Sequence, residues 1–252
     1  YTEAPDVVNE IARLRELTFR KVGEGTGKKK DVDKYDKYYK HLVLWDDDEL
    51  EIVGSYRIGI CKDILAEMSS ESLYTSTLFH FSDKFNELLP ESIELGRSFI
   101  QEKYWNSSAL DYLWQGIGSF IYSRPDIKYL FGAVSLSDSY PDDAKNLIVY
   151  FYSTWFGSTE KLVSSRDKYN MSYKVLDDLR KLFPHEDYKK ELKTLKERLK
   201  IYGVTIPTLY KQYADLCEET GVRFFDFNTD KNFNNCIYGL IFVNINLIKE
   251  NK

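Results

Sequence analysis

Apolar positions recur along the chain with two spacings, which predict a succession of helices and strands. Between residues 6 and 19, and again between 110 and 121, the apolar side chains fall on one stripe at helical spacing. Runs rich in β-branched and aromatic residues predict strands at 41–45, 51–59, 93–101 and 129–137. Three aspartates separate the first two of these runs, which indicates an antiparallel hairpin.

The second half of the chain is predicted to be mainly helical and to end in two strands. Helices are expected at 142–156, 173–183, 186–202 and from Pro207 to Gly221, with breaks at Pro184 and Gly203. The closing strands are expected at 222–227 and 237–245. This order of elements describes an α/β domain with a mixed sheet. We expect one domain over residues 1–252, with a helical insertion around 158–204.

Residues 21–39 show no periodicity, are polar and include three glycines. They predict a long loop, which folding energetics alone would not require in a compact domain, and such loops are often binding elements. The loop contains the basic run Lys28, Lys29 and Lys30.

Composition narrows the class of protein. No run of about 18 apolar residues occurs, which excludes a helix that spans a membrane, and the first residues lack a signal-peptide pattern. Three widely spaced cysteines suggest neither a disulfide framework nor a zinc site, so we expect no metal and a reducing, cytoplasmic location. A formal net charge of −5 argues against nucleic-acid binding.

Charged residues spread over the first hundred positions are the candidates for chemistry. They are Arg15, beside Phe19 on the first helix, Asp33 and Asp36 in the loop, and Arg57, Glu94 and Arg97 on strands. Taken singly, each reads as a surface ion pair of little energetic weight. Together they follow an order and spacing that is typical of one enzyme superfamily.

The segments that carry this likeness are RLRELTF, DVDKYD, HLVL, IVGSYRI, ELGRSFI, LDYLWQGIGSFI and YLFGAVSLSDSYP. They resemble acyl-homoserine-lactone synthases and the related ornithine-lipid and N-acyl amino acid synthases of the GNAT superfamily. The tail TLYKQYADLCEETGVRFFDFNTD resembles proteins of gut Bacteroidota named hemolysins, some of which look like glycine N-acyltransferases. The resemblance implies a GNAT-like (acyl-CoA N-acyltransferase) fold, a mixed central sheet flanked by helices. It also implies transfer of a long-chain fatty acyl group, 3-hydroxylated chains included, onto the amine of an amino acid, with glycine preferred.

Two departures from the superfamily pattern bear on the substrates. Between Arg97 and Leu110 the sequence SFIQEKYWNSSA has no glycine, so the loop that usually cradles the coenzyme A pyrophosphate is missing. An acyl carrier protein therefore becomes the expected donor and partner, with acyl-coenzyme A as the alternative and no separate cofactor. The early tryptophan that lactone synthases favour in the loop is also missing, which argues against S-adenosylmethionine as a substrate.

The resemblance assigns roles to the charged residues. Glu94 is the candidate base, Asp33 and Asp36 are candidates for binding the acceptor's ammonium group, and Arg57 or Arg97 for its carboxylate. In a regular strand Glu94 and Arg97 would point to opposite faces, unless a bulge intervenes, which Gly96 could permit. The alternative is an ion-pair network that anchors the loop, with Arg97 paired to Asp33 or Asp36.

Two further candidates are His41 and Trp114. His41 begins a predicted strand and could relay a proton, although a lone histidine beside apolar residues is more often structural. Trp114 could line an acyl tunnel with Leu73, Tyr74 and neighbouring aromatic residues, or it could belong to the core.

Rival functions stay open at this point. One is a coenzyme-A-dependent short-chain N-acetyltransferase, and another is a non-enzymatic protein that contacts membranes peripherally, suggested only by the hemolysin name. The sequence offers no long amphipathic helix with a basic face for that role. A catalytically inactive interaction module is the third.

Overall fold

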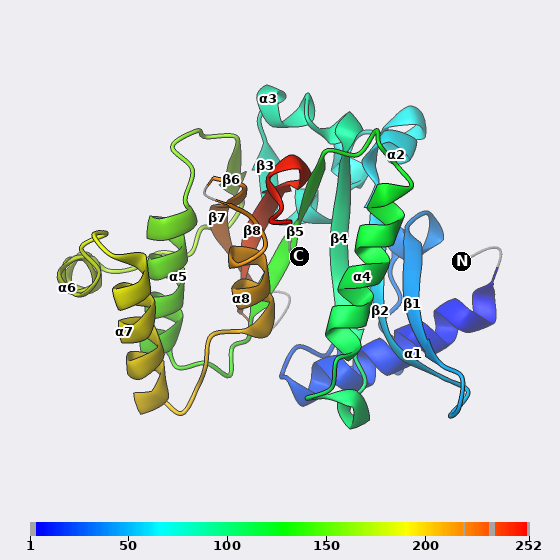
Figure 1. The fold of residues 1–252 in the computed structure, drawn as a ribbon, viewed down its shortest axis with the longest axis horizontal. Helices are drawn as coiled ribbons and strands as arrows, with labels where there is room; N and C mark the ends of the chain where they lie inside the picture. The colour runs from blue at the N-terminus through cyan, green and yellow to red at the C-terminus, as the bar shows by residue number, and fades with distance from the viewer. Residues whose placement is uncertain (1–3, 219, 232–234, 251–252) are drawn as a thin grey trace. The chain divides into compact units, whose positions relative to one another are not determined.

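The structure is a computed structural model that describes residues 4–218, 220–231 and 235–250 (Figure 1). Contacts among these residues divide them into two compact units. Unit 1 comprises the described residues up to Thr77 together with Asn86–Gly132, and unit 2 comprises Leu78–Phe85 and the described residues from Ala133 onward. A single domain over 1–252 stays a prediction, and each unit is described by itself.

Unit 1 is built on four neighbouring strands. They are β1 (Lys40–Asp46), β2 (Glu51–Ile60), β4 (Ser92–Ile100) and the first half of β5 (Tyr129–Leu136). The pairs β1–β2 and β2–β4 are antiparallel, whereas β4 and β5 run parallel with Glu94 opposite Phe131. The mixed sheet predicted from the sequence is therefore confirmed, as is the hairpin.

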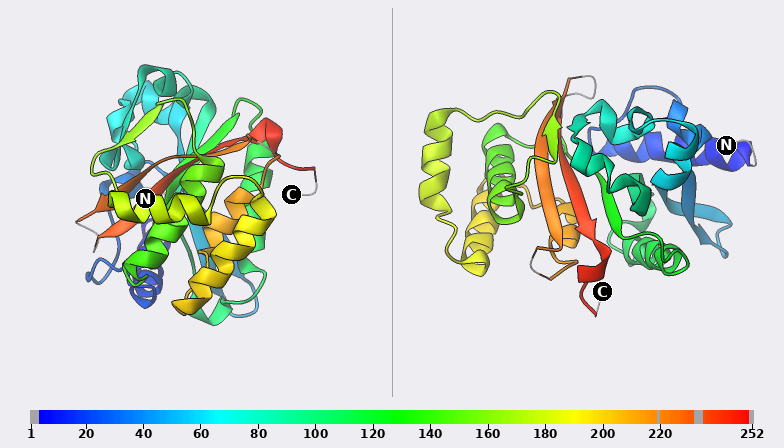
Figure 2. Two further views of the ribbon diagram at one scale, coloured as in Figure 1. Left: turned by 90° about the vertical axis from the view of Figure 1, so that its left-hand side faces the viewer. Right: turned by 90° about the horizontal axis from the view of Figure 1, so that it is seen from above.

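Two helices cover the opposite faces of this sheet, α1 (Pro5–Lys21) and α4 (Ala109–Tyr122) (Figure 2). Adjacent residues of a strand point to opposite faces, and β1 shows this directly. Val43 packs with Ile11 and Leu14 of α1, whereas Leu42 lies against Gly116 of α4, where an added Cβ would come within 3.1 Å of it. Residues that neighbour one another on β1 and β2 are thus sorted between an α1 face and an α4 face.

Short elements occupy stretches for which the sequence pattern predicted neither a helix nor a strand. They are η1 (Lys34–Lys37), α2 (Cys61–Glu67), η2 (Ser70–Ser72), η3 (Tyr74–Thr77), β3 (Phe79–Phe81), α3 (Asp83–Asn86), η4 (Leu89–Glu91) and η5 (Glu102–Tyr104). Most of them have three or four residues, too few for a periodic pattern to develop. The predicted loop over 21–39 therefore contains one turn of 3₁₀ helix.

Unit 2 holds the remaining helices and two antiparallel strand pairs, β3–β6 and β7–β8. Its elements are α5 (Asp142–Phe156), β6 (Val163–Ser165), α6 (Tyr173–Leu182), α7 (Tyr188–Ile201), α8 (Thr208–Ala214), β7 (Val222–Asp230), β8 (Cys236–Asn244) and η6 (Ile245–Leu247). Gly203 ends α7 with φ of +69°, a conformation that favours glycine. The helix predicted from Pro207 to Gly221 is wrong in length, because α8 ends at Ala214.

Aromatic side chains hold α5 and α8 to β7 in unit 2. The ring of Tyr152 lies 5.0 Å from those of both Tyr210 and Phe224, and all three side chains are buried. The segment predicted as a helical insertion, around 158–204, contains β6, α6 and α7, with α7 packed on α5 (Figure 1).

Candidate functional site

A bulge in β4 shapes the candidate site of unit 1. Arg57 of β2 pairs with Gly96 and Ser55 pairs with Phe99, so one residue of β2 faces two residues of β4. Arg97 is one of these two, and its φ of +48° places it in the left-handed region. Of the two alternatives that the sequence left open, a bulged and a regular strand, the structure has the bulge, and its left-handed residue is Arg97.

The bulge lets Glu94 and Arg97 approach the same residue, Tyr74. The backbone N–H of Tyr74 donates to Glu94 Oε2 at 3.0 Å, and the Arg97 guanidinium lies 5.1 Å from the centre of the Tyr74 ring. Regular alternation would have directed these two side chains to opposite faces.

Glu94 is a buried carboxylate whose hydrogen-bond donors are all uncharged. Its side chain is 1% exposed. The Tyr39 hydroxyl donates to Oε2, beside the Tyr74 N–H, and the Thr75 N–H donates to Oε1 at 2.6 Å. Within the part of the chain that the structure describes, no arginine, lysine or histidine forms an ion pair with it. A buried charge without a cationic partner is costly, so such a group calls for an explanation.

Asp36 is the opposite case, a buried carboxylate between two guanidinium groups. Arg15 contacts both of its oxygens, at 3.3 and 3.0 Å, and Arg57 Nη1 lies 3.2 Å from Oδ1. Burial would raise the pKa of Asp36, but the charges of Arg15 and Arg57 outweigh it and hold this pKa at about 2. Asp36 is therefore ionised and neutralised at any physiological pH.

A third aspartate, Asp31, completes the buried network. Arg15 Nε lies 2.9 Å from Asp31 Oδ2, and Arg15 Nη2 donates to the Asp31 backbone carbonyl. The Asp31 N–H in turn donates to the carbonyl of Ala12 in α1 at 3.0 Å. This residue was not among the predicted site residues, although it opens the segment DVDKYD that carries the other two aspartates.

Asp33 and Arg97 form the accessible edge of the network. Their side chains are 22% and 10% exposed, compared with 2% for Arg57. Arg57 Nη1 donates to Asp33 Oδ1 at 2.7 Å, whereas Arg97 Nη2 lies 3.8 Å from Asp33 Oδ2, too far for a hydrogen bond. Asp33 Oδ2 has no hydrogen-bond partner among the described residues.

Aromatic rings surround the two arginines at this edge. The Arg57 guanidinium lies 5.4, 5.3 and 5.5 Å from the ring centres of Tyr35, Tyr39 and Tyr74. Phe19 of α1 lies 5.9 Å from the Arg97 guanidinium. These distances are typical of cation–π contacts, which hold the guanidinium groups in place.

His41 lies next to the network without forming a hydrogen bond to it. Its Nε2 is 3.5 Å from Asp36 Oδ1, and neither ring nitrogen has a partner among the described residues. Burial lowers the pKa of His41 to about 4, because the opposing effect of Asp36 is smaller and Arg15 and Arg57 add to the lowering. The imidazole is therefore neutral at physiological pH.

Trp114 is not part of this cluster. It packs edge-on against Tyr56 at 6.3 Å, on the face of the sheet that α4 covers, whereas the neighbouring Arg57 points to the α1 face. Leu73, which was grouped with Trp114 as a candidate tunnel residue, is fully buried. The other predicted site residues, from Arg15 to Arg97, lie together.

Sequence reasoning missed Tyr39 and Thr75, both of which contact Glu94. Tyr39 is the last residue of the loop segment DVDKYDKYY. The only signal in the sequence for this position is the repeated tyrosine within that segment. Thr75 contributes a backbone N–H, which any residue except proline supplies, so the sequence carries no signal for it.

The basic run of the loop is exposed, and Glu16 anchors the chain just before it. Glu16 accepts hydrogen bonds from the Thr26 and Gly27 N–H groups at 3.0 and 2.9 Å. Lys28, Lys29 and Lys30 follow directly, with Lys30 donating to the Asn9 side chain at 3.0 Å. The chain that leads into the three lysines is thus anchored to α1.

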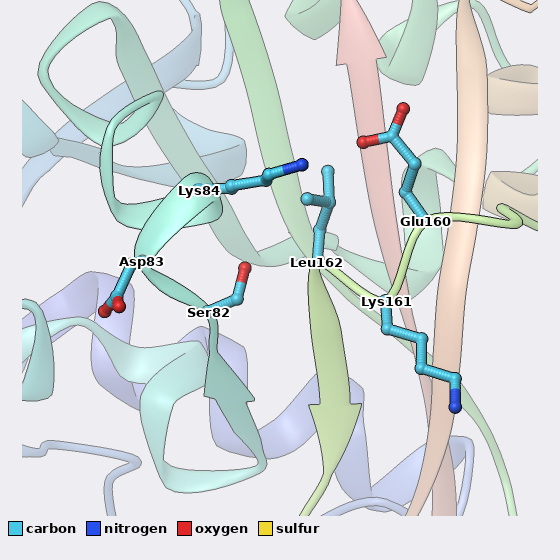
Figure 3. A pocket seen from close by; sticks show the side chains of 6 residues that line it. All are labelled: Ser82, Asp83, Lys84, Glu160, Lys161 and Leu162. Carbon is cyan, nitrogen blue, oxygen red and sulfur yellow. The ribbon is translucent and has the colours of Figure 1, made fainter.

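A separate hollow of about 400 Å³ lies in unit 2 and involves none of the predicted site residues (Figure 3). It is lined by Ser82, Asp83, Lys84, Glu160, Lys161 and Leu162. Two lysines and two carboxylates line it, so its charge favours no class of ligand.

Every helix among the described residues is too short or too polar to span a bilayer.

Comparison with known proteins agrees with the resemblance seen in the sequence. The family described as "Acetyltransferase (GNAT) domain" matches residues 14–115. A glycine N(alpha)-acyltransferase of Bacteroides thetaiotaomicron is 37% identical over 228 residues, which cover 86% of this chain and 67% of the relative.

Two further relatives carry related names. A glycine N(alpha)-acyltransferase of Phocaeicola vulgatus is 34% identical over 266 residues, covering 100% of this chain and 80% of that protein. An L-ornithine N(alpha)-acyltransferase of Rhizobium meliloti is 25% identical over 208 residues, covering 79% and 67%. The match to the Phocaeicola protein covers the whole of this chain, so the residues of β4 and of the loop before β1 lie within it. The chain therefore belongs to the family of amino-acid N(alpha)-acyltransferases within the GNAT superfamily, and it is an acyltransferase that forms an amide from a thioester.

Proposed function

We propose that the protein transfers a long-chain acyl group, 3-hydroxyacyl chains included, from an acyl-carrier-protein thioester to the amine of glycine. The acceptor is supported by the names of the two relatives at 37% and 34% identity, against 25% for the relative that is named for ornithine. The observation that carries the chemistry is Glu94, a buried carboxylate that accepts only uncharged donors.

The reaction is the aminolysis of a thioester. Glycine first loses one proton to solvent, and its neutral amine then attacks the thioester carbonyl carbon. As the N–C bond forms, Glu94 takes the second proton from nitrogen; the C–S bond then breaks and the thiolate leaves. Glu94 returns the proton to the sulfur, so the products are an N-acyl glycine and the free carrier thiol. No cofactor besides the donor is required.

The other two candidate bases nearby, Asp36 and His41, are poorly suited to the role. The pKa of Asp36, at about 2, makes it too weakly basic, because burial is outweighed by two guanidinium groups. The pKa of His41, lowered to about 4 chiefly by burial, makes the imidazole a weak base as well. A general base works best when its pKa lies near the working pH.

Arg97 and Asp33 are the proposed contacts of the acceptor. A carboxylate pairs well with a guanidinium, and Arg97 is more exposed than Arg57 or Arg15. Asp33 lies beside Arg97, its side chain is 22% exposed, and its carboxylate is proposed to accept a hydrogen bond from the acceptor's amine. Asp36, Arg57 and Arg15 then act behind them as a fixed support, with Phe19 packed on Arg97.

The proposed donor rests on two features. The connection between β4 and α4 contains no glycine that would let backbone N–H groups close around a pyrophosphate. The exposed Lys28, Lys29 and Lys30 could attract an acidic carrier protein. The acyl transfer would then take place in the cytoplasm, and the protein would contact the membrane peripherally where the product is released.

One experiment tests donor and acceptor together. The protein is incubated with palmitoyl and 3-hydroxypalmitoyl carrier protein, with the matching coenzyme A thioesters and with acetyl-coenzyme A. Each donor is offered an equimolar mixture of glycine, serine, ornithine and lysine, and the products are identified by mass. We expect N-acyl glycine from the carrier-bound donors. Mainly N-acyl ornithine or lysine would overturn the acceptor, and acetylated products alone would establish the short-chain alternative.

A further inference from the structure

The two oxygens of Glu94 are not equivalent. Oε2 accepts two hydrogen bonds, from the Tyr39 hydroxyl and from the Tyr74 N–H at 3.0 Å. Oε1 accepts one, from the Thr75 N–H at 2.6 Å. A carboxylate oxygen has two lone pairs, so the partners on Oε2 fill both and one lone pair of Oε1 remains open among the described residues.

Tyr39 is the side chain that creates this difference. The single N–H of Tyr74 is shared between Glu94 Oε2 and the Tyr39 hydroxyl oxygen, at 3.0 Å from each, and Tyr39 in turn donates its hydroxyl hydrogen to Glu94. The ring is buried and packs against Tyr35 at 5.8 Å and beneath the Arg57 guanidinium at 5.3 Å. Gly59 of β2 makes room for the ring, because an added Cβ there would approach it to 2.5 Å. The hydroxyl is therefore fixed in both position and direction.

We infer that Tyr39 is a positioning residue for the proton transfer, and that Oε1 of Glu94 is the oxygen that receives the proton. By occupying Oε2 from the protein side, Tyr39 holds the carboxylate plane in one orientation and leaves Oε1 to the acceptor's amine. This inference rests on the proposed role of Glu94 as base. It adds a residue that acts only through Glu94 and contacts neither substrate.

The neighbouring Tyr38 offers a matched control. Its hydroxyl donates to the backbone carbonyl of Ser72 at 2.9 Å, so it too ties the end of the loop to the segment that precedes Tyr74. It forms no hydrogen bond with Glu94. Tyr38→Phe and Tyr39→Phe thus each remove one hydroxyl that holds the same segment, and only the second touches the carboxylate.

The test is a double-mutant cycle between Tyr39→Phe and Glu94→Gln, measured as kcat and KM for donor and acceptor. We expect Tyr39→Phe to lower kcat roughly 10- to 100-fold, the effect of a misplaced reacting group, with both KM values changed by less than about twofold. In the Glu94→Gln background the same change should cost less than about twofold, because the group that it positions no longer acts as a base. Tyr38→Phe should keep kcat within about twofold of the wild type.

Two results would overturn the inference. One is an equal loss from Tyr39→Phe in both backgrounds, and the other is an equal loss from Tyr38→Phe, since either would show a structural effect. Wild-type turnover by Glu94→Gln is a different outcome, which removes the proposed base itself. Thermal melting of every variant, with assays run well below the lowest midpoint, keeps the comparison independent of folding.

Discussion

Unit 1 contains two carboxylates that are buried to the same degree and surrounded in opposite ways. Asp36 and Glu94 are both 1% exposed. Asp36 lies between the guanidinium groups of Arg15 and Arg57, whereas Glu94 accepts bonds from a hydroxyl and two backbone N–H groups. Two guanidinium groups neutralise the first carboxylate, which makes it a structural anchor, whereas the second has no counter-charge and is the one proposed to act as the base. Burial alone would not have separated these roles.

Glu94→Gln is the most direct test of the difference between the two carboxylates. The amide keeps the size of the side chain but removes its basicity, so the fold should survive while kcat falls about 100- to 10,000-fold. The measurement is kcat for N-acyl glycine formation at neutral pH, with circular dichroism to verify folding. A smaller loss that is rescued at high pH would mean that Glu94 only orients the acceptor. Unchanged turnover at every pH would remove it from the mechanism.

Asp36→Asn should harm stability more than chemistry. It leaves Arg15 and Arg57 buried with one counter-charge fewer, and breaking a buried pair in this way costs about 3–5 kcal/mol of unfolding free energy. Urea denaturation measures the loss. Asp33→Asn is the control, because Asp33 is 22% exposed and pairs most closely with Arg57, which keeps Asp36 at 3.2 Å after the change. Equal losses from the two variants would contradict the distinction between an anchored interior and an accessible edge.

The pH dependence of stability separates His41 from Asp36. The pKa of His41 is lowered from 6.5 to about 4, chiefly by burial, so the unfolded chain takes up a proton that the folded chain refuses. Stability is therefore full above pH 6.5 and falls by up to about 3 kcal/mol as pH drops toward 4. His41→Gln should flatten that range.

Asp36 contributes to the pH dependence of the unfolding free energy in a lower and separate pH range. Its folded pKa, about 2, lies below the ordinary 3.8 because the arginine charges outweigh burial, so its contribution is present above pH 3.8 and is lost as pH falls toward 2. Urea midpoints measured at intervals from pH 8 to pH 2 check both ranges. No slope between pH 6.5 and 4 in the wild type would contradict the burial of a neutral His41.

The smallest effect is expected from the basic run, which lies outside both carboxylate sites. Changing Lys28, Lys29 and Lys30 to glutamate should raise KM for acyl carrier protein several-fold and more strongly at low salt, because screening weakens a surface attraction. kcat at saturating donor should be unchanged. If acyl-coenzyme A serves as well as the carrier and the variant is silent, the docking role of these lysines fails.

Much of the fold could be predicted because its long elements carry a clear period. The apolar stripe of 6–19 became α1, and the run at 51–59 became β2 almost residue for residue. The stretch between Cys61 and Glu91 was not predictable in the same way. Its helices and its single short strand take their shape from tertiary contacts, as when Glu94 holds the first two N–H groups of η3.

The residues of the candidate site could be predicted from the sequence, but the difference between Asp33 and Asp36 could not. The resemblance to a known family identified Asp33, Asp36 and Arg57, and nothing in the sequence could decide which aspartate would face solvent. That outcome depends on which side chain an arginine reaches, and Arg15 reaches Asp31 and Asp36 and not Asp33. Gly96 allowed a bulge in β4 as one of two alternatives, but the sequence carries no signal that Arg97, and not the glycine beside it, would take the left-handed conformation.

The extra residue in β4 also determines what the deletion of one residue from this strand would do. Every residue after the bulge keeps its place on the sheet only because two residues of β4 stand opposite one of β2. Deleting Ser98 would remove this mismatch, leave Phe99 in its buried position, and return Arg97 to ordinary strand geometry, directed away from Glu94. A three-nucleotide deletion could thus yield a folded and more relaxed sheet that has lost its reaction. The length of this strand would then serve the reaction proposed for Glu94 and Arg97 and not the stability of the sheet.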